Sequence, residues 1–184
     1  MLKIIATLWF CLIASGATQA ASQRLWDYPC DAFMSEVCLR LPHDMSLRYS
    51  VPADFGVYTI ENPEGVLVSM YVGSGPRLSK EWGSPSISLG SQASPIRGYH
   101  SIVDGKERLD VIINPVGSKN DFVHLFADFS ESKREAIAMV VAGLRRCTRP
   151  SVENLRCPIR SDEGRLLAEW VQAQKMMVDA LSHP

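Results

Sequence analysis

The dipeptide Asp104-Gly105 constrains the fold more than any other feature of the chain. It lies between two runs of strand-forming residues, Tyr99–Val103 and Arg108–Ile113. An Asp-Gly pair suits a two-residue type I′ turn, because both central positions of that turn need a positive φ angle. In the second run the apolar residues Leu109, Val111 and Ile113 fall on alternate positions, as in a half-buried strand. The stretch therefore predicts a β-hairpin.

A third strand is predicted over Phe122–Phe129, after the strand-breaking residues Asn114–Gly117. Nearly every residue of this run is a strand former. One face of the strand would carry Val123, Leu125, Ala127 and Phe129, and the other Phe122, His124, Phe126 and Asp128. The pattern therefore predicts a central strand that is covered on both sides.

A helix is predicted directly after this strand. Ser132 and Glu135 have the spacing of a capping box, in which each side chain bonds a backbone N–H at the helix start. Apolar residues then recur at i, i+3, i+4 and i+7, which places them in one stripe facing a sheet. These residues are Ile137, Val140, Val141 and Leu144. Arg145 and Arg146 follow at the expected helix end, where cations suit the helix dipole.

Three earlier runs extend the predicted sheet. Met45–Ser50, Phe55–Glu61 and Val66–Val72 form an antiparallel meander in this interpretation. Its last strand would turn one apolar face inward, made of Val66, Val68, Met70 and Val72. The predicted fold class is therefore α+β: an antiparallel β-sheet with flanking helices, braced by disulfides.

Two further helices are expected outside this core. Asp31–Leu41 has the spacing of a short helix with its apolar residues inward. A C-terminal helix is predicted over residues 161–182, with Ser161 as its N-cap. This long helix either packs on the domain or offers a surface to a partner or a second copy. The oligomeric state is left open.

Residues 1–20 have the features of a signal peptide. Lys3 supplies a positive charge, Ile4–Ala14 form an apolar run that is too short to span a bilayer, and Thr18-Gln19-Ala20 suits cleavage after Ala20. Cys11 follows bulky residues and would leave with this segment. A retained membrane anchor is the alternative. Cleavage would leave residues 21–184 as one domain, exported to the periplasm and not embedded in a membrane.

The charge of the exported part excludes one class of partner. The 19 basic residues of the chain become 18 without Lys3, against 20 acidic residues, so this part is close to neutral. It lacks a basic stripe of the kind that nucleic-acid binding needs. The sequence has no Asn-x-Ser/Thr acceptor, which agrees with a bacterial source. Another protein is the expected partner.

Four cysteines remain after cleavage: Cys30, Cys38, Cys147 and Cys157. An even number in an exported chain indicates disulfides, with three possible connectivities. A continuous helix would separate Cys30 from Cys38 too far for a bond, since eight residues rise about 12 Å. A loop or broken turn there allows the two local pairs, which we favour. Metal binding is the weaker alternative, because there is no Cys-x-x-Cys.

Residues 73–95 are dense in Gly, Ser and Pro and are predicted to form a long loop. A loop of this length is usually functional or disordered. Two interpretations fit: a mobile insertion with Trp82 against the sheet, or a binding loop that presents Ser74, Arg77, Lys80 and Trp82. Trp and Arg are common anchors of protein interfaces, so the second interpretation makes these four the candidate binding residues.

The sequence carries no catalytic signature. It has no Gly-x-Ser-x-Gly elbow, its histidines lack metal-ligand spacing, and Gly73-Ser74-Gly75-Pro76 is not followed by the helix start that a phosphate loop needs. His100 and Ser101 point to opposite faces of their strand. Asp110 and Asp128 could meet across strands as solvated acids, and His124 fits a structural role. We therefore expect a protein without enzymatic activity, metal or cofactor.

The run Leu47–Phe55, with the sequence LRYSVPADF, precedes strands and then a helix from Glu135 to Leu144-Arg145. This pattern resembles small proteins of the PsbP/Mog1 type, including exported bacterial members, over about Leu47 to Arg146. The resemblance implies an antiparallel sheet with flanking helices and a non-catalytic accessory role. It implies no catalytic residue. The loop over residues 73–95 and the cysteine pairs are not part of the family's pattern.

These observations support a non-enzymatic, exported binding or accessory protein. An inhibitor or immunity protein for an enzyme that acts on the cell envelope is one such function. The alternative is a carrier of a small ligand or lipid, with a cavity between the sheet and the C-terminal helix. An enzyme would need a cleft with clustered ionisable groups.

Overall fold

The computed structural model describes residues 30–34, 36–52, 55–74, 83–114, 122–151 and 154–175. The predicted signal peptide lies outside the described residues. Strands and two helices make up most of what is described, so the predicted α+β class is confirmed. The helices in this part of the chain are too short or too polar to cross a bilayer.

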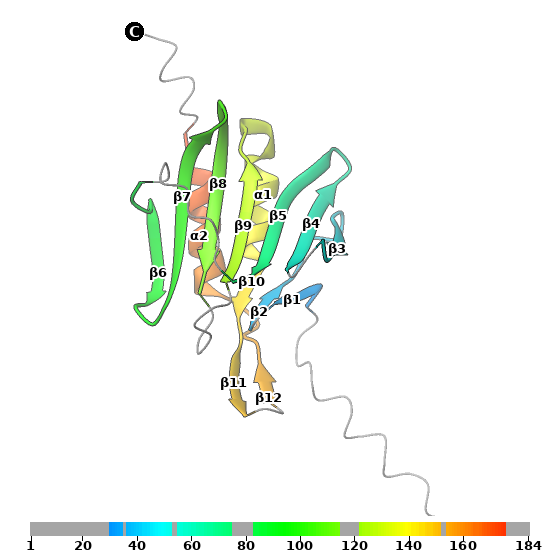
Figure 1. Ribbon diagram of the computed structural model, residues 1–184, viewed down its shortest axis with the longest axis vertical. Helices are drawn as coiled ribbons and strands as arrows, with labels where there is room; N and C mark the ends of the chain where they lie inside the picture. The colour runs from blue at the N-terminus through cyan, green and yellow to red at the C-terminus, as the bar shows by residue number, and fades with distance from the viewer. Residues whose placement is uncertain are drawn as a thin grey trace, which may run out of the picture.

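A seven-stranded antiparallel sheet forms the centre of the molecule (Figure 1). Its strands, in spatial order, are β3 (Ser46–Ser50), β4 (Gly56–Asn62), β5 (Gly65–Gly73), β9 (Phe122–Asp128), β8 (Lys106–Ile113), β7 (Ser94–Val103) and β6 (Ile87–Ser91). Every neighbouring pair except β5 and β9 is consecutive in the sequence. The sheet is therefore two meanders joined along one central ladder.

The turn between β7 and β8 is the predicted hairpin turn. Asp104 has φ 52° and Gly105 has φ 75°, so both central residues adopt the positive φ that a type I′ turn requires. Val103 pairs with Lys106 directly beside the turn. The hairpin prediction is confirmed.

Both helices, α1 (Arg134–Ala142) and α2 (Asp162–Ala173), lie on one face of the sheet (Figure 1). The apolar stripe predicted for α1 is buried: Ile137, Val140 and Val141 are each at most 3% exposed. The helices approach closely where a Cβ on Gly164 would lie 2.8 Å from the carbonyl oxygen of Ala142, the last residue of α1. The core fills the space between helices and sheet.

The predicted start and end of α1 are wrong. Lys133 is the N-cap and makes no side-chain cap bond, and a 3-10 turn over Glu131–Lys133 precedes the helix. The Ser132 hydroxyl instead bonds that of Ser130, which satisfies it locally and leaves the capping box unformed. The helix ends before Gly143, and Leu144–Arg146 form strand β10. Leu144, the last residue of the predicted stripe, is buried, but it lies in β10 and not in the helix.

The short helix predicted over Asp31–Leu41 is also wrong. Strands β1 (Ala32–Met34) and β2 (Val37–Leu39) form a hairpin there, with Glu36 at φ 72° in the turn. Strand β10 pairs with β2 on the other side. Pairing with β10 buries all three residues of β2, which a single helix would not achieve. Another hairpin follows β10 and consists of β11 (Thr148–Ser151) and β12 (Asn154–Arg156).

The C-terminal helix begins as predicted but ends earlier. The Ser161 hydroxyl accepts a bond of 3.0 Å from the Gly164 N–H, as an N-cap does. The helix ends at Ala173, and Gln174 has extended backbone. The Gln174 side chain donates to the Trp170 carbonyl at 2.8 Å, which satisfies one of the last helical acceptors. Predicted residues 176–182 lie outside the described part.

The predicted meander is present as β3, β4 and β5, with one change of face. A register shift at Ile60 and Glu61 displaces the pairing beside the turn. Val66 is consequently 49% exposed, whereas Leu67 is 2% exposed and joins the core. The predicted loop over residues 73–95 is wrong in its second half, because Ile87–Ser91 form the edge strand β6. Ile87 and Leu89 pack against the core and hold this strand in place.

Candidate functional site

The sheet face opposite the helices carries the candidate site, and we call it the open face. Met70, Leu125 and Val111 are register partners on the helix-covered face, where they are buried. Their neighbours along each strand point the other way, since side chains alternate across a sheet. Tyr71, His124, Phe126, Asp110 and Ile112 therefore project from the open face.

Three charged or titratable side chains meet on this face, and we call them the open-face cluster: Arg108, Asp110 and His124. Asp110 Oδ1 accepts bonds from Arg108 Nε at 3.0 Å and Nη2 at 2.8 Å. His124 Nε2 is hydrogen-bonded to the same oxygen at 2.7 Å. The side chain of Asp110 is fully buried, that of His124 is 9% exposed and that of Arg108 is 24% exposed. The cluster is thus an ion pair with a histidine, set into the sheet.

Burial of Asp110 is tolerable because a cation lies beside it. An unpaired carboxylate inside a protein is costly, and the Arg108 guanidinium offsets that cost with two charge-assisted bonds. Asp110 Oδ2 is buried and has no hydrogen-bond partner among the residues that the structure describes. Arg108 also lies 4.6 Å from the centre of the Phe126 ring, which adds a cation–π contact. These contacts hold the guanidinium in one place.

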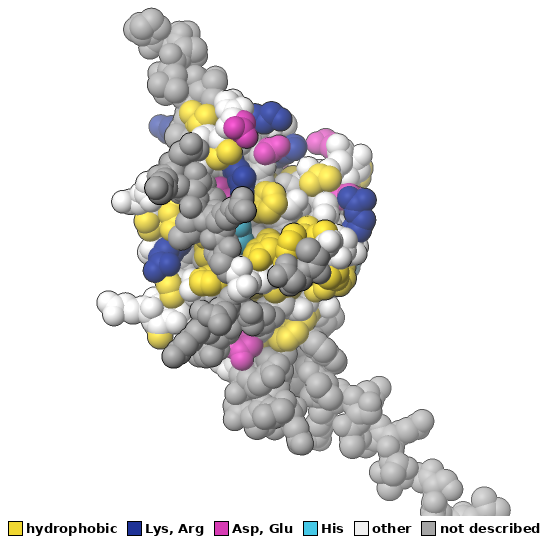
Figure 2. Space-filling model, in the orientation of Figure 1, with side chains coloured by type: hydrophobic (Ala, Val, Ile, Leu, Met, Phe, Trp, Pro, Cys, Tyr) yellow, Lys and Arg dark blue, Asp and Glu magenta, His cyan; other side chains and the backbone are white. Residues whose placement is uncertain are grey.

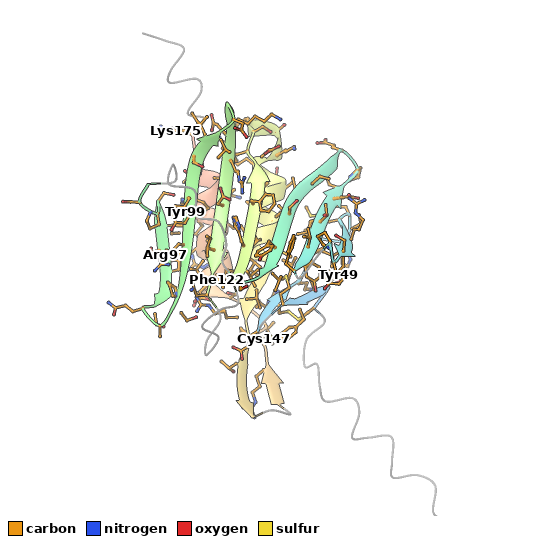
Figure 3. All side chains as sticks on the ribbon, in the orientation of Figure 1. Tyr49, Arg97, Tyr99, Phe122, Cys147 and Lys175 are labelled. Carbon is orange, nitrogen blue, oxygen red and sulfur yellow. A yellow bond between two sulfur atoms is a disulfide. The ribbon has the colours of Figure 1, made fainter. Side chains whose placement is uncertain are left out.

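Half-buried aromatic side chains surround the cluster. The rings of Phe55 and Tyr71 are in contact, with their centres 5.0 Å apart and their planes tilted by 50°. Phe122, at the start of β9, and Phe126 are also partly exposed. Figure 2 shows hydrophobic side chains beside a histidine on this face, and Figure 3 labels Phe122 and Tyr99. The open face therefore combines apolar area with the cation of Arg108, which its contacts hold in place.

The sequence did not predict this cluster. It suggested Asp110 with Asp128, but Asp128 is exposed and lies directly opposite Arg108. Side chains alternate along each strand, but this does not show by itself that Asp110 and His124 share a face. Their common face follows only from the register of β8 and β9. That register is a property of the two strands together, which the residue pattern of either strand does not fix.

Of the four predicted loop residues, only Ser74 is described. Its carbonyl oxygen accepts a bond of 3.2 Å from the Tyr71 hydroxyl, so the start of the segment is attached to the open face. Arg77, Lys80 and Trp82 lie outside the described residues. The two local disulfides are present: Cys30–Cys38 and Cys147–Cys157, with Cα separations of 5.5 and 4.1 Å.

A second histidine cluster lies on the helix-covered face of the same hairpin. His100 Nε2 is 2.9 Å from Glu107 Oε2, and His100 Nδ1 is 3.1 Å from Gln174 Oε1. The side chains of His100 and Glu107 are 6% and 1% exposed. We call these three residues the inner cluster. It joins the end of α2 to the β7–β8 hairpin, which is a structural role.

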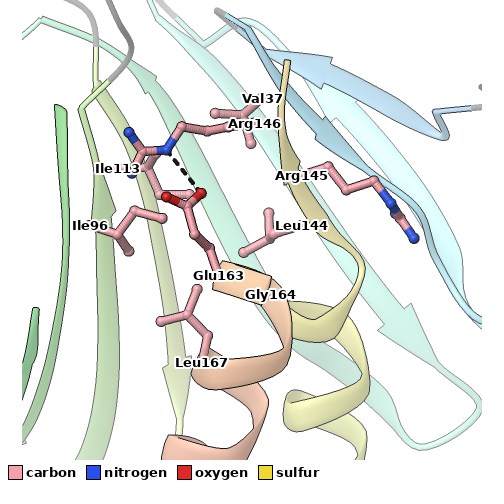
Figure 4. Close-up of a pocket in the computed structure, with 9 residues that line it drawn as sticks. All are labelled: Val37, Ile96, Ile113, Leu144, Arg145, Arg146, Glu163, Gly164 and Leu167. Carbon is pink, nitrogen blue, oxygen red and sulfur yellow. Dashed lines mark ion pairs between the residues drawn. The ribbon is translucent and has the colours of Figure 1, made fainter. Parts of the chain in front are cut away.

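Two small hollows lie between the sheet and the helices. One lies where β10 meets α2, with Arg146 and Glu163 paired at 3.1 Å beside it (Figure 4). The other lies under α1, against Val68 and Leu125. Each has room for about one water molecule. Neither hollow includes a member of the open-face cluster, so neither gives that cluster a substrate cleft.

No protein-family model matches the chain, and no significant match to it is found among curated proteins or solved structures.

Proposed function

We propose that the chain is a non-enzymatic, exported protein that binds another protein through its open face. The observation that carries this proposal is the group of half-buried aromatic side chains around an arginine, on a sheet face that neither described α-helix covers. Aromatic residues and arginine contribute most of the binding energy in protein interfaces. A purely structural sheet face would instead carry scattered polar residues.

The open-face cluster favours binding because it fixes its arginine before a partner arrives. Arg108 is held by Asp110 on one side and by Phe126 on the other. A side chain that is already ordered loses less conformational entropy on association. The cluster also lacks an adjoining cleft among the described residues, which favours binding over catalysis.

The proposed compartment is the periplasm. The chain has two disulfides. Disulfides persist in oxidising compartments and are rare in the cytosol. A signal peptide over residues 1–20 with cleavage after Ala20 remains our proposal for the route of export. The PsbP/Mog1-type resemblance, with its accessory role, is compatible with a binding function.

The proposed partner is an enzyme that acts on the cell envelope, with this chain as its inhibitor or immunity protein. The predicted loop residues Ser74, Arg77, Lys80 and Trp82 would extend the interface, because Ser74 is bonded to Tyr71 of the open face. The carrier alternative gains no support from the two water-sized hollows.

The test is chemical cross-linking in periplasmic extract with the oxidised protein, followed by calorimetry with the identified partner. Replacing both Tyr71 and Phe122 by Ala should weaken binding by at least about tenfold, since one interface anchor contributes about 2 kcal/mol. The matched control is Tyr49→Ala, which removes a 55% exposed tyrosine from the edge strand β3. It should leave the dissociation constant within about twofold, because an exposed side chain outside an interface contributes little.

A variant with Arg77→Ala and Trp82→Ala separates the two surfaces. If that variant alone loses binding, the loop is the interface and the open-face proposal is wrong. If the wild-type protein captures no protein at all, the binding function is dropped and bound small molecules are sought by mass spectrometry. An inhibitor role requires, in addition, that the chain lower the activity of the captured enzyme.

A further inference from the structure

The two disulfides lie side by side at the junction of the small sheet and the β11–β12 hairpin. The Sγ atoms of Cys30, Cys38 and Cys157 all lie within 4.8 Å of one another. Cys157 is bonded to Cys147, whose position at this junction is labelled in Figure 3. Four sulfur atoms are therefore gathered in one cluster, although the two bonded pairs come from distant parts of the chain.

Backbone pairing explains why the two disulfides meet. Strand β2 carries Cys38 and pairs with β10, so that Cys38 lies opposite Arg145. The backbone N–H of Cys147 then donates to the carbonyl of Glu36 at 2.7 Å. The β11–β12 hairpin returns the chain, and Thr148 pairs with Arg156 just before Cys157. The contact between the disulfides is thus fixed by two strand ladders and one further backbone hydrogen bond.

The sulfur atoms differ in their exposure. Cys38 and Cys147 are 1% and 2% exposed, and Cys157 is 9% exposed. Cys30 is partly exposed and is thus the most exposed residue of the four. Phe33 packs against the group and keeps much of it away from water. An external thiol would therefore attack at Cys30.

We propose that the four cysteines form one thiol–disulfide exchange site whose substrate is a dithiol, with Cys157 as the link between the two pairs. One thiolate of the dithiol attacks Cys30 Sγ, which breaks Cys30–Cys38 and leaves the Cys38 thiolate. That thiolate attacks the neighbouring Cys157 Sγ, which forms Cys38–Cys157 and releases the Cys147 thiolate. The second thiol of the dithiol then attacks the dithiol sulfur that is bonded to Cys30. This step closes the dithiol into a disulfide and releases the Cys30 thiolate.

The steps balance. The dithiol loses two electrons and becomes a disulfide, and the chain gains two electrons and two protons as the thiols of Cys30 and Cys147. The second protein disulfide is not reduced but moves from Cys147–Cys157 to Cys38–Cys157. Thiolate attack at a disulfide sulfur is the general route of such exchange.

The geometry assigns the link to Cys157 and not to Cys147. Cys157 belongs to the group of three sulfurs within 4.8 Å of one another, and Cys147 does not. A thiolate at Cys38 therefore meets the Cys157 sulfur first. The exchange product should contain Cys157 and leave Cys147 free.

Tryptic peptides distinguish these products. Residues 25–40 form one peptide that contains both Cys30 and Cys38, whereas Cys147 and Cys157 fall on the separate peptides 147–156 and 157–160. The native protein joins 147–156 to 157–160 and leaves 25–40 unlinked. Exchange through Cys157 joins 25–40 to 157–160, a product that the native pairing never gives.

The experiment treats the folded, oxidised protein with a limiting amount of dithiothreitol, followed by acid quenching, alkylation of free thiols and non-reducing peptide mapping. We expect the 25–40/157–160 product, with alkylated Cys147. Its rate should rise about tenfold per pH unit below about pH 8.5, because the thiolate attacks. Absence of any joined product overturns the proposal, and a 25–40/147–156 product overturns the assignment to Cys157.

Two single variants provide a matched pair. Cys147→Ser leaves Cys157 free beside Cys30–Cys38, and Cys157→Ser leaves Cys147 free. The first should give at least about ten times more joined product than the second, since Cys157, and not Cys147, belongs to the group of three sulfurs within 4.8 Å of one another. Equal yields would contradict the assignment. Circular dichroism confirms folding of each variant, and the wild-type mapping decides the question if either fails to fold.

Discussion

The two faces of the central sheet each bury a histidine next to a carboxylate, yet the two clusters differ in what surrounds them. The inner cluster of His100, Glu107 and Gln174 is sealed by α2. The open-face cluster contains a permanently charged arginine and has half-buried aromatic rings around it. The same pair of side-chain types therefore serves packing on one face and presents a cation on the other.

Asp110→Ala should have the largest effect, because it leaves the positive charge of Arg108 without its partner inside the sheet. Removing one member of a buried ion pair destabilises a protein by about 3–5 kcal/mol. Urea denaturation followed by circular dichroism measures this change. The control Asp128→Ala removes an exposed acid from the same face and should lower the free energy of unfolding by less than about 0.5 kcal/mol. Equal losses would show that the cluster is no ion pair in solution.

Gly98→Ala should lower the free energy of unfolding by about 1–3 kcal/mol, through steric overlap on the covered face. An added Cβ would lie 2.6 Å from Ile87 Cγ2 and 2.9 Å from Trp170 Cη2, so α2 would have to move away from the sheet. The thermal midpoint reports this effect. An unchanged midpoint would mean that α2 packs less closely than the structure shows.

Gln174→Ala tests whether the hydrogen bonds of the inner cluster stabilise the end of α2. The variant loses the bond to His100 and the bond to the Trp170 carbonyl, so its free energy of unfolding should fall by about 1 kcal/mol. Lys175→Ala, one residue further along and exposed, is the control and should change stability by less than about 0.5 kcal/mol. If both variants behave alike, the inner cluster does not stabilise the end of α2.

The smallest effect is expected at the rim of the covered face, at high pH. Burial raises the pKa of Tyr58, and the neighbouring Tyr49 raises it further. The unfolded chain then loses the Tyr58 proton first, at about pH 10, so stability falls as the pH rises through that value. Tyr58→Phe should reduce this slope in denaturation curves measured between about pH 9 and pH 11. An unchanged slope would assign the effect to other groups.

Local signals predicted the fold where they agreed with long-range packing. Asp104-Gly105 specified its turn, and the stripe of Ile137, Val140 and Val141 identified the buried side of α1. The capping box of Ser132 and Glu135 failed because a nearby serine competed for the same hydroxyl. A local pattern is reliable when no equally local alternative exists.

The features that the sequence did not reveal depend on how strands pair, which the residue pattern of one segment does not fix. Strand β2 forms because β10 lies beside it, about a hundred residues later in the chain. Strand β6 forms in a Gly- and Ser-rich stretch because β7 offers a free edge. The contact between Asp110 and His124 needs the register of β8 and β9. The candidate site is therefore less predictable than the sheet that holds it.

The single non-consecutive ladder of the sheet, between β5 and β9, has a consequence for folding kinetics. The strands β3–β5 and β6–β9 can each form through hairpins between neighbours in sequence, which close quickly. The pairing of Met70 with Leu125 joins these two units across a long stretch of chain, and such contacts slow folding. We expect the two meanders to form first and their docking along β5 and β9 to set the folding rate.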